Sequence, residues 1–488
     1  MMSIDEVFKR ARRDLFYPPI KFELSNTLRS YFDFSSRKYK IVVSKSQIEF
    51  LSDKALLGLF HHELNHWVKH PYDAKTIILE MYWIKDKKNS NIIRNLFDDV
   101  VVNLDLIVNK GLTDITNVFK ELKPKSKLDN LIRALLSELT GLDFGDFSLD
   151  EDLKRRLDKL LEIDFLNTSK TILKKNIKKF AEVVEDIAAY DYPFITFGIE
   201  DFPEFEIKRA LRDLANELDK DEYVEIIKEF LKEIDKKPTI SDGISRDFEN
   251  PEIEWYKTRA KKYTIYIRST KKTGSLYPYE IRDFELEDGI DKYIPTESYG
   301  KVIPGIAKRY EFEDFEGLTK NLPNVVIVID SSNSMRNPDK EVSYAVLGAF
   351  AIARTYLENG AKVGVVNFSN KNIELLPTRG DIVYRTIKIY QGGGTRLDVK
   401  SLENYIKKVR KADYVFITDA GFQNIDEVID FFSRLKQKVT FIWIKTDVSE
   451  LDEFKENFKK LKALKNLEII EIYKEEDIPK IAINSVQS

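Results

Sequence analysis

Residues 325–330, VVIVID, decide the fold of the C-terminal third of the chain. The run is short, apolar and rich in β-branched residues, which is typical of a strand buried on both faces. Similar runs follow at residues 362–368, 413–418, 439–444 and 467–472, and amphipathic segments of helical period alternate with them. Alternating strands and helices predict a doubly wound parallel sheet, so we expect an α/β domain here.

The first half of the chain has a different texture. Residues 1–235 carry apolar residues at three- and four-residue spacing among dense charges, which predicts a mostly helical domain with an insertion of charged helices from about residue 112. Residues 236–321 are rich in Tyr, Gly and Pro, and indicate a connecting segment with a few short strands. We therefore expect an α/β multidomain protein with parts at 1–235, 236–321 and 322–488.

Composition excludes several classes of protein. The 488 residues include 79 Lys and Arg against 82 Asp and Glu, a net charge of −3, so the chain lacks the basic field of a nucleic-acid binder. Cysteine is absent, which excludes disulfides, thiol catalysis and cysteine-bound zinc. No apolar run approaches the ~20 residues of a membrane-spanning helix, and no signal peptide is recognisable. We expect a soluble, cytoplasmic protein with no membrane or nucleic-acid partner.

All four histidines lie in one segment, LLGLFHHELNHWVKHP, at residues 56–71. Ser52 or Asp53 can cap a helix that enters this segment. Pro71 disfavours helical backbone at the residue before it, so the helix should end near His70.

Two of these histidines have the spacing of a metal site. His62 and His66 are separated by one helical turn, so both imidazoles can bind one Zn²⁺. Glu63 completes an HExxH pattern, in which a carboxylate beside the metal acts as general base on its water. A strand-like run just upstream, residues 38–44, stands where zincins have the edge strand that lines the substrate cleft.

Zinc needs a third protein ligand. The metzincin pattern is excluded, because Lys69 and Tyr72 occupy the positions of its Gly and third His. His70 lies on the same stripe as His62 and His66, but the helix is ending there, so we expect it to cap the helix or to support a ligand. A carboxylate on a second helix is preferable.

The next helix supplies two candidate carboxylates. Ser90 can cap it and Gly111 ends it, and its apolar interior contains Asp98 and Asp99. Consecutive helical residues point about 100° apart, so only one of the two is expected to face the site. We favour Asp99 as the ligand, with Asn103 on the same face as its neighbour, and Asp98 as the substitute.

A second metal site is predicted at the end of the first strand of the α/β domain. Asp330, Ser332 and Ser334 form a DxSxS pattern there, while Thr395 follows a run of three glycines and Asp419 follows another strand. Ligands bind at the carboxyl ends of parallel strands in such sheets. Hydroxyl and carboxylate oxygens suit Mg²⁺, Ca²⁺ or Mn²⁺.

This pattern resembles the von Willebrand factor A domain over residues 322–488. The order DxSxS, Thr, Asp is that of the family's metal-ion-dependent adhesion site, although Asn333 stands where many members have Gly. The resemblance implies that Asp330, Ser332, Ser334, Thr395 and Asp419 bind a divalent cation. It also implies that an acidic residue of a protein partner completes the cation's coordination.

The whole chain resembles the von Willebrand A-containing zinc metallopeptidases of prokaryotes. In that family the first motif continues as HExxHxxxxHP, here residues 62–71, and the second reads AxDxxxN, here 97–103 with Phe97 in place of Ala. The resemblance supports Asp99 and implies a zincin-like helical domain. It also implies a MoxR-type AAA+ ATPase as partner. No GxxxxGK[ST] loop occurs in this chain, so ATP would be hydrolysed by that partner.

Two functions of different classes remain. The first is a zinc peptidase that cleaves a peptide or protein and binds its partner or substrate through Mg²⁺. The second is an adaptor or assembly factor without catalytic activity, in which zinc is structural and the adhesion site acts with the ATPase.

Overall fold

The computed structural model describes residues 3–17, 20–26, 31–33, 40–188, 199, 202–234, 241–264, 278–285, 288–298, 300, 302–303, 306–312, 322–409 and 411–478. The chain forms two compact units. The helical unit comprises Met1–Asp213, Lys228–Arg246 and Leu276–Glu313, and the α/β unit comprises Leu214–Ile227, Asp247–Ser275 and Asp314–Ser488. Residues of the expected connector, 236–321, are thus divided between the two units.

The helical unit is built mainly from helices, with five short strands among its described residues. Its helices are α1 (Ile4–Asp14), α2 (Lys45–Ile48), α3 (Asp53–Val68), α4 (Ala74–Trp83), α5 (Ser90–Leu104), α6 (Ile115–Glu121), α7 (Lys127–Thr140), α8 (Glu151–Leu161) and α9 (Lys170–Val184). Its strands are β1 (Lys21–Ser25), β2 (Tyr31–Asp33), β3 (Lys40–Ser44), β4 (Pro278–Asp283) and β5 (Lys308–Phe312). The helices α10 (Glu204–Glu217), α11 (Lys220–Ile234) and α12 (Ser241–Asp247) contribute residues to both units.

The α/β unit is built on a six-stranded sheet in the order β11-β10-β9-β6-β7-β8. The strands are β6 (Asn324–Asp330), β7 (Val363–Phe368), β8 (Asn372–Thr378), β9 (Ala412–Thr418), β10 (Val439–Ile444) and β11 (Leu467–Ile472). The helices are α13 (Pro251–Lys261), α14 (Tyr344–Glu358), α15 (Asp381–Lys388), α16 (Val399–Lys408), α17 (Ile425–Arg434) and α18 (Asp452–Lys462). The predicted α/β class is therefore confirmed, and the predicted parallel sheet is parallel except at its edge strand β8.

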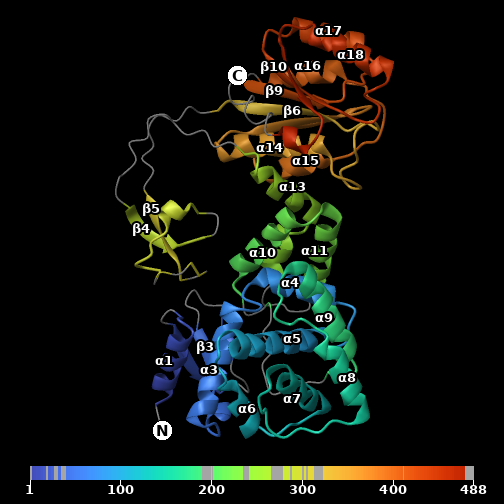
Figure 1. Ribbon diagram of the computed structural model, residues 1–488. Coiled ribbons are helices and arrows are strands. Elements are labelled where there is room, and N and C mark those ends of the chain that lie inside the picture. Colours follow the sequence, from blue (N-terminus) through green and yellow to red (C-terminus); the bar gives the residue numbers. More distant parts are fainter. Residues whose placement is uncertain are drawn as a thin grey trace. The chain divides into compact units, whose positions relative to one another are not determined.

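Helices cover both faces of this sheet, with α14 and α15 on one face and α16, α17 and α18 on the other (Figure 1). Successive side chains of β6 are buried toward opposite faces: Val326 and Val328 belong to the core beneath α16 to α18. This two-sided burial explains why the strand is an unbroken apolar run. The edge strand β8 pairs antiparallel with β7, and it was not predicted, because its side chains alternate in burial and are only partly covered.

The strand upstream of the histidines occupies a different place from the expected one. β3 lies between β1 and β2 in a three-stranded sheet, parallel to the first and antiparallel to the second. Its IVV core, Ile41–Val43, is buried, which suits a central strand. The prediction of an edge strand at 38–44 is therefore wrong, and residues 38–39 lie outside the described residues.

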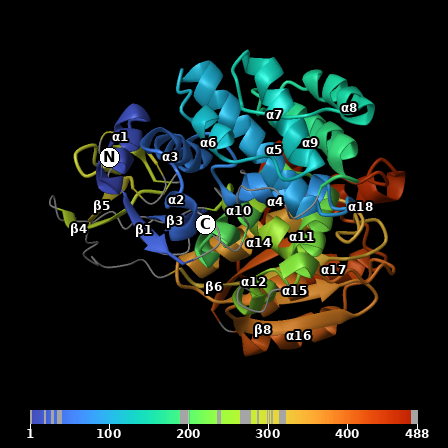
Figure 2. The same ribbon diagram turned by 90° about the horizontal axis from the view of Figure 1, so that it is seen from below.

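The two helices that carry the candidate zinc ligands are held in the core of the helical unit. Ser52 caps α3 by accepting a hydrogen bond from the backbone of Ala55 at 3.2 Å, and the helix ends at Val68, as its sequence predicts. α5 contacts α3, α4, α7 and α9, and both views show it among them (Figures 1 and 2). Every residue from Ile92 to Leu104 is buried, so polar side chains in this stretch face the interior of the protein.

A glycine on α3 lets this helix approach the start of α6. A Cβ atom on Gly58 would lie 2.4 Å from the carbonyl oxygen of Asp114 and 2.6 Å from the nitrogen of Ile115. These are backbone atoms, so a rotamer change cannot relieve the clash. We predict that Gly58→Ala destabilises the protein by about 1–3 kcal/mol, the usual cost of overpacking.

Denaturant unfolding measures this change. The exposed Lys54→Ala on the same helix is the control, and we expect it to stay within about 0.5 kcal/mol of the wild type. A Gly58→Ala variant as stable as the wild type would contradict the close approach of the two segments.

Among the described residues, none of the helices combines the length and the apolar character needed to span a bilayer.

Candidate metal centre

Helices α3 and α5 bring two histidines and one aspartate together. The Nε2 atoms of His62 and His66 are 3.1 Å apart. The Oδ1 atom of Asp99 lies 3.1 Å from Nε2 of His66 and 3.4 Å from Nε2 of His62. All three residues are buried, with at most 5% of their surface exposed. These are the three residues that the sequence predicts as zinc ligands.

The outer nitrogens of the two imidazoles determine which atom faces the centre. Nδ1 of His62 donates a hydrogen bond to Oδ1 of Asn103 at 2.8 Å, and Nδ1 of His66 donates to the carbonyl oxygen of His70 at 3.0 Å. Both partners are acceptors only, so each Nδ1 carries the proton. In the neutral imidazoles each Nε2 therefore presents a lone pair toward Asp99.

Three acceptor atoms thus converge on one point. A proton can join only two of them, whereas a divalent cation can bind all three. Zinc bonds of about 2.0–2.1 Å in a tetrahedral site place neighbouring ligand atoms about 3.3–3.4 Å apart, close to the spacing found here. Burial opposes ionisation of Asp99, but the adjacent His62 and His66 imidazoles hold its pKa below the ordinary value. The buried group can hold a metal ion.

Asn103 fixes the orientation of a ligand imidazole through the hydrogen bond to His62. Partners of this kind typically contribute about 10–100-fold to metal affinity. We predict a loss of that size in zinc affinity for Asn103→Ala, measured by competition with a chromophoric chelator. The exposed Asn91→Ala on the same helix should leave the affinity unchanged. Equal affinities for both variants would show that Asn103 does not support the site.

Glu63 lies beside His62 on α3 and is 3% exposed. Its Oε1 atom has no hydrogen-bonding partner among the described residues. Burial raises the pKa of this carboxyl to about 8, and the negative charge of Asp99 adds to the shift, while His62 opposes it. A cation bound by the histidines would favour the carboxylate form, which can accept a proton from a nearby water.

His70 and Asp98 do not join this centre with their side chains. Asp98 accepts a hydrogen bond from Nη1 of Arg94 at 3.0 Å and lies 3.2 Å from Nε2 of His70. It points away from His62 and His66 because adjacent residues on α5 diverge by about 100°. Asp98 lies with His70 and Glu80, so the geometry favours Asp99 over Asp98 as the ligand beside His62 and His66. His70 supports His66, as expected, but through its backbone carbonyl.

Two carboxylates of the second predicted site meet at the carboxyl ends of β6 and β9. Asp330 accepts hydrogen bonds from the backbone N–H of Ser332 at 2.9 Å and from the hydroxyl of Thr418 at 2.6 Å. Ser334 donates from its hydroxyl to Asp419. Burial, reinforced by the charge of Asp419, raises the pKa of Asp330 to about 7. Two buried carboxylates that repel each other favour a bound cation.

Backbone hydrogen bonds join the loops that carry the other predicted ligands. Asn333 donates to the carbonyl of Gly393 at 2.9 Å, which ties the DxSxS loop to the loop of Thr395. The carbonyl of Thr395 accepts from the backbone of Gln423 at 2.8 Å, four residues beyond Asp419. The hydroxyls of Ser332 and Ser334 are 3.1 Å apart. The structure thus brings the three predicted segments to one edge of the sheet.

Sequence reasoning missed two threonines that support these carboxylates. Thr418 holds Asp330, and the hydroxyl of Thr446 donates to Oδ2 of Asp419 at 3.1 Å. Thr418 could have been found, since it stands directly before Asp419 at the end of an apolar strand. Thr446 is distant in sequence, and only the pairing of β9 with β10 brings it near.

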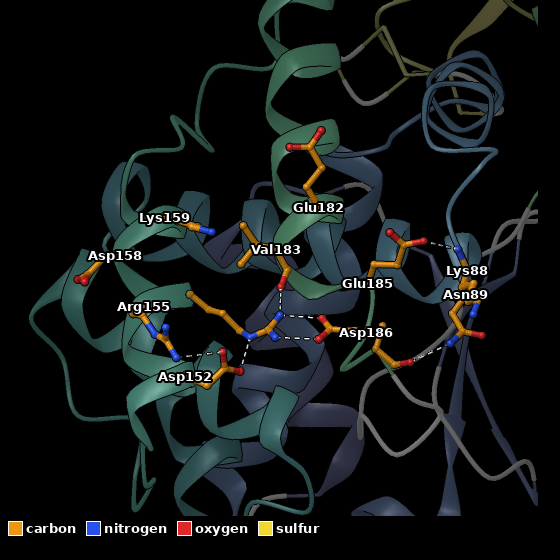
Figure 3. Close-up of a pocket in the computed structure, with 12 residues that line it drawn as sticks. Lys88, Asn89, Asp152, Arg155, Asp158, Lys159, Glu182, Val183, Glu185 and Asp186 are labelled. Atoms are coloured by element: carbon orange, nitrogen blue, oxygen red, sulfur yellow. Dashed lines mark hydrogen bonds and ion pairs between the residues drawn. The ribbon is translucent and has the colours of Figure 1, made fainter.

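Two pockets of the helical unit differ in chemistry. One, of about 890 Å³, is lined mostly by charged residues of α8 and α9, among them Asp152 and Asp186 (Figure 3). Arg156 bridges these two aspartates at 2.7 Å each. Its guanidinium is thus already paired. The other, of about 370 Å³, has a mainly apolar surface, to which Trp67 and Val68 of α3 contribute. Five charged residues also line it: Asp73, Lys75, Glu206, Arg209 and Asp213.

Neither a scan against protein-family models nor a search of curated proteins finds a match to this chain.

Proposed function

We propose that the helical unit is a zinc-dependent peptidase. His62, His66 and Asp99 would bind the zinc ion, and Glu63 would act as general base. The observation that carries the proposal is the convergence of three buried acceptor atoms, 3.1–3.4 Å apart, beside a carboxylate whose Oε1 has no partner among the described residues. The HExxH resemblance supports the same assignment.

The chain's own residues divide the work of peptide hydrolysis. A bound zinc ion would polarise the scissile carbonyl and acidify a water molecule. Glu63 takes the proton of the attacking water and delivers it to the leaving amine. Asn103 and the carbonyl of His70 hold the two imidazoles in the tautomer that presents Nε2 to the metal. The pocket lined by Trp67 and Val68 has a mainly apolar surface with charged residues in its lining, which suits a side chain of a peptide substrate.

For the α/β unit we propose a von Willebrand A-type domain. Asp330, Ser332, Ser334, Thr395 and Asp419 would hold Mg²⁺, and an acidic residue of a protein partner would complete its coordination. The sheet order, the helices on both faces and the meeting of three ligand segments at one edge support this proposal. By the same resemblance, the expected partner is a MoxR-type AAA+ ATPase.

A thermal-shift experiment tests the Mg²⁺ site. A ligand that binds only the folded state stabilises it by about 2.7 kcal/mol at 100 times Kd, so Mg²⁺ should raise the melting temperature. We predict that Asp419→Asn abolishes this dependence, because it removes one of the two carboxylates. The exposed Asp426→Asn should retain it. If Mg²⁺ shifts Asp419→Asn as much as the wild type, the assignment is wrong.

One observation favours a second candidate function, a non-catalytic adaptor. The four residues of the HExxH centre, His62, Glu63, His66 and Asp99, are at most 5% exposed, a burial typical of structural zinc sites. The adaptor would bind zinc without cleaving peptides and act through the Mg²⁺ site.

Incubation of the zinc-loaded full-length protein with a mixed peptide library, read by mass spectrometry, separates the two functions. Cleavage that a chelator stops and zinc restores supports the peptidase. Bound zinc without cleavage of any peptide supports the adaptor.

A further inference from the structure

A second buried group of potential ligands lies next to the first. It consists of His70, which follows α3, Glu80 on α4 and Asp98 on α5, and their ligand atoms all lie within 4.8 Å of one another. Nε2 of His70 is 2.8 Å from Oε1 of Glu80 and 3.2 Å from Oδ1 of Asp98. All three residues are 0% exposed. The zinc peptidase proposal uses none of these side chains.

The polar atoms of this group are incompletely paired. Nε2 of His70 can present one N–H, so it can serve only one of the two carboxylate oxygens that it faces. Oε2 of Glu80 and Nδ1 of His70 have no hydrogen-bonding partner among the described residues. A buried polar atom without a partner costs about 1–3 kcal/mol, and more when it is charged. The fully buried Glu80 carboxylate therefore points to a missing ligand.

The charges of Glu80, Asp98 and Arg94 are compatible with a bound cation. Arg94 binds the outer oxygen of Asp98, Oδ2, at 3.0 Å and leaves Oδ1 directed at His70. A proton on His70 is the competing occupant: it would balance the two carboxylates together with Arg94. Such a proton would still leave Oε2 of Glu80 without a partner. A divalent cation could bind this oxygen and Oδ1 of Asp98 together with Nε2.

We propose that His70, Glu80 and Asp98 bind a second divalent transition-metal ion, of the Zn²⁺ or Mn²⁺ type. One imidazole with two carboxylates suits these ions better than it suits Mg²⁺ or Ca²⁺, which prefer sites made only of oxygen atoms. The ion is structural, because complete burial gives substrate no open coordination position. The ion ties the end of α3 to α4 and α5. Its ligand Asp98 is next in sequence to Asp99, and the backbone carbonyl of its ligand His70 orients His66. The proposal does not depend on peptidase activity.

Zinc content of the full-length protein tests the inference. The protein is loaded with excess Zn²⁺ in buffer with millimolar Mg²⁺, which occupies the all-oxygen site, then desalted and analysed by mass spectrometry of the metal. We expect two zinc ions per chain in the wild type and one in the His62→Ala/His66→Ala variant. One ion in the wild type and none in that variant would overturn the second site and leave the first intact. One ion in both would retain the second site and remove the first.

A charge-removing variant gives a second readout. Glu80→Gln should lower the zinc content from two to one, and the exposed Asp86→Asn, just beyond α4, should leave it at two. If Glu80→Gln does not fold, the His62→Ala/His66→Ala variant still decides, because Zn²⁺ should raise its melting temperature and a chelator should reverse the rise. A melting temperature of that variant unaffected by Zn²⁺ would contradict the site.

Discussion

Glu63→Gln should abolish peptide hydrolysis while the protein keeps its zinc. The substitution keeps the shape of the side chain but removes the group that takes the proton from water. General base catalysis typically contributes about 10²–10⁴-fold, so kcat/KM should fall by that factor. The zinc content should not change, since Glu63 is not among the converging acceptor atoms. Hydrolysis of a peptide found in the library experiment, followed by chromatography, measures the loss.

The matched control is Glu138→Gln, an exposed residue of α7 in the same unit. It removes the same charge without touching the centre, and its kcat/KM should equal that of the wild type. Retained activity in Glu63→Gln would remove the general base from the mechanism. Absence of activity in the wild type, with zinc bound, would favour the adaptor.

Asp99→Asn should lose most of the affinity of the first site for zinc. The amide keeps the size of the side chain but removes the negative charge that attracts the cation to a buried position. The loss should exceed the ~10–100-fold expected of Asn103→Ala, because a ligand itself changes rather than its support. Zinc titration against a competing chelator measures the affinity, and peptide hydrolysis should fall in parallel.

The exposed Asp86→Asn is the control for charge, and it should bind zinc like the wild type. The third ligand would have to be another residue if Asp99→Asn held zinc as tightly as its control. Because the second proposed site retains its own ion, the titration is analysed in the Glu80→Gln background as well.

Helical geometry explains why the histidine pair and its aspartate could be predicted. A spacing of four residues places His62 and His66 on one face of α3 whatever surrounds the helix. Asp99 shares a helical face with Asn103, and Asp98 does not. This difference in position favoured Asp99 over Asp98 as the ligand from the sequence alone. The same logic located Asp330 and Asp419, since parallel strands end at one edge of a sheet.

Other features depend on contacts that no local pattern encodes. In the sequence, nothing distinguishes Glu80 from other charged residues of short helices. Only the packing of α4 beside α5 places it next to His70 and Asp98. The central position of β3 follows from pairing with β1 and β2, both short strands without a strong pattern. From the sequence, Gly58 is expected only to destabilise its helix, whereas in the structure it allows α3 to approach the start of α6 closely.

The most direct test of the zinc centre is anomalous diffraction at the zinc edge from crystals of the zinc-loaded full-length protein. We predict a peak bonded to Nε2 of His62, Nε2 of His66 and Oδ1 of Asp99, at the ~2.0–2.2 Å typical of zinc. Crystals that contain zinc elsewhere but show no peak between these three atoms would contradict the account.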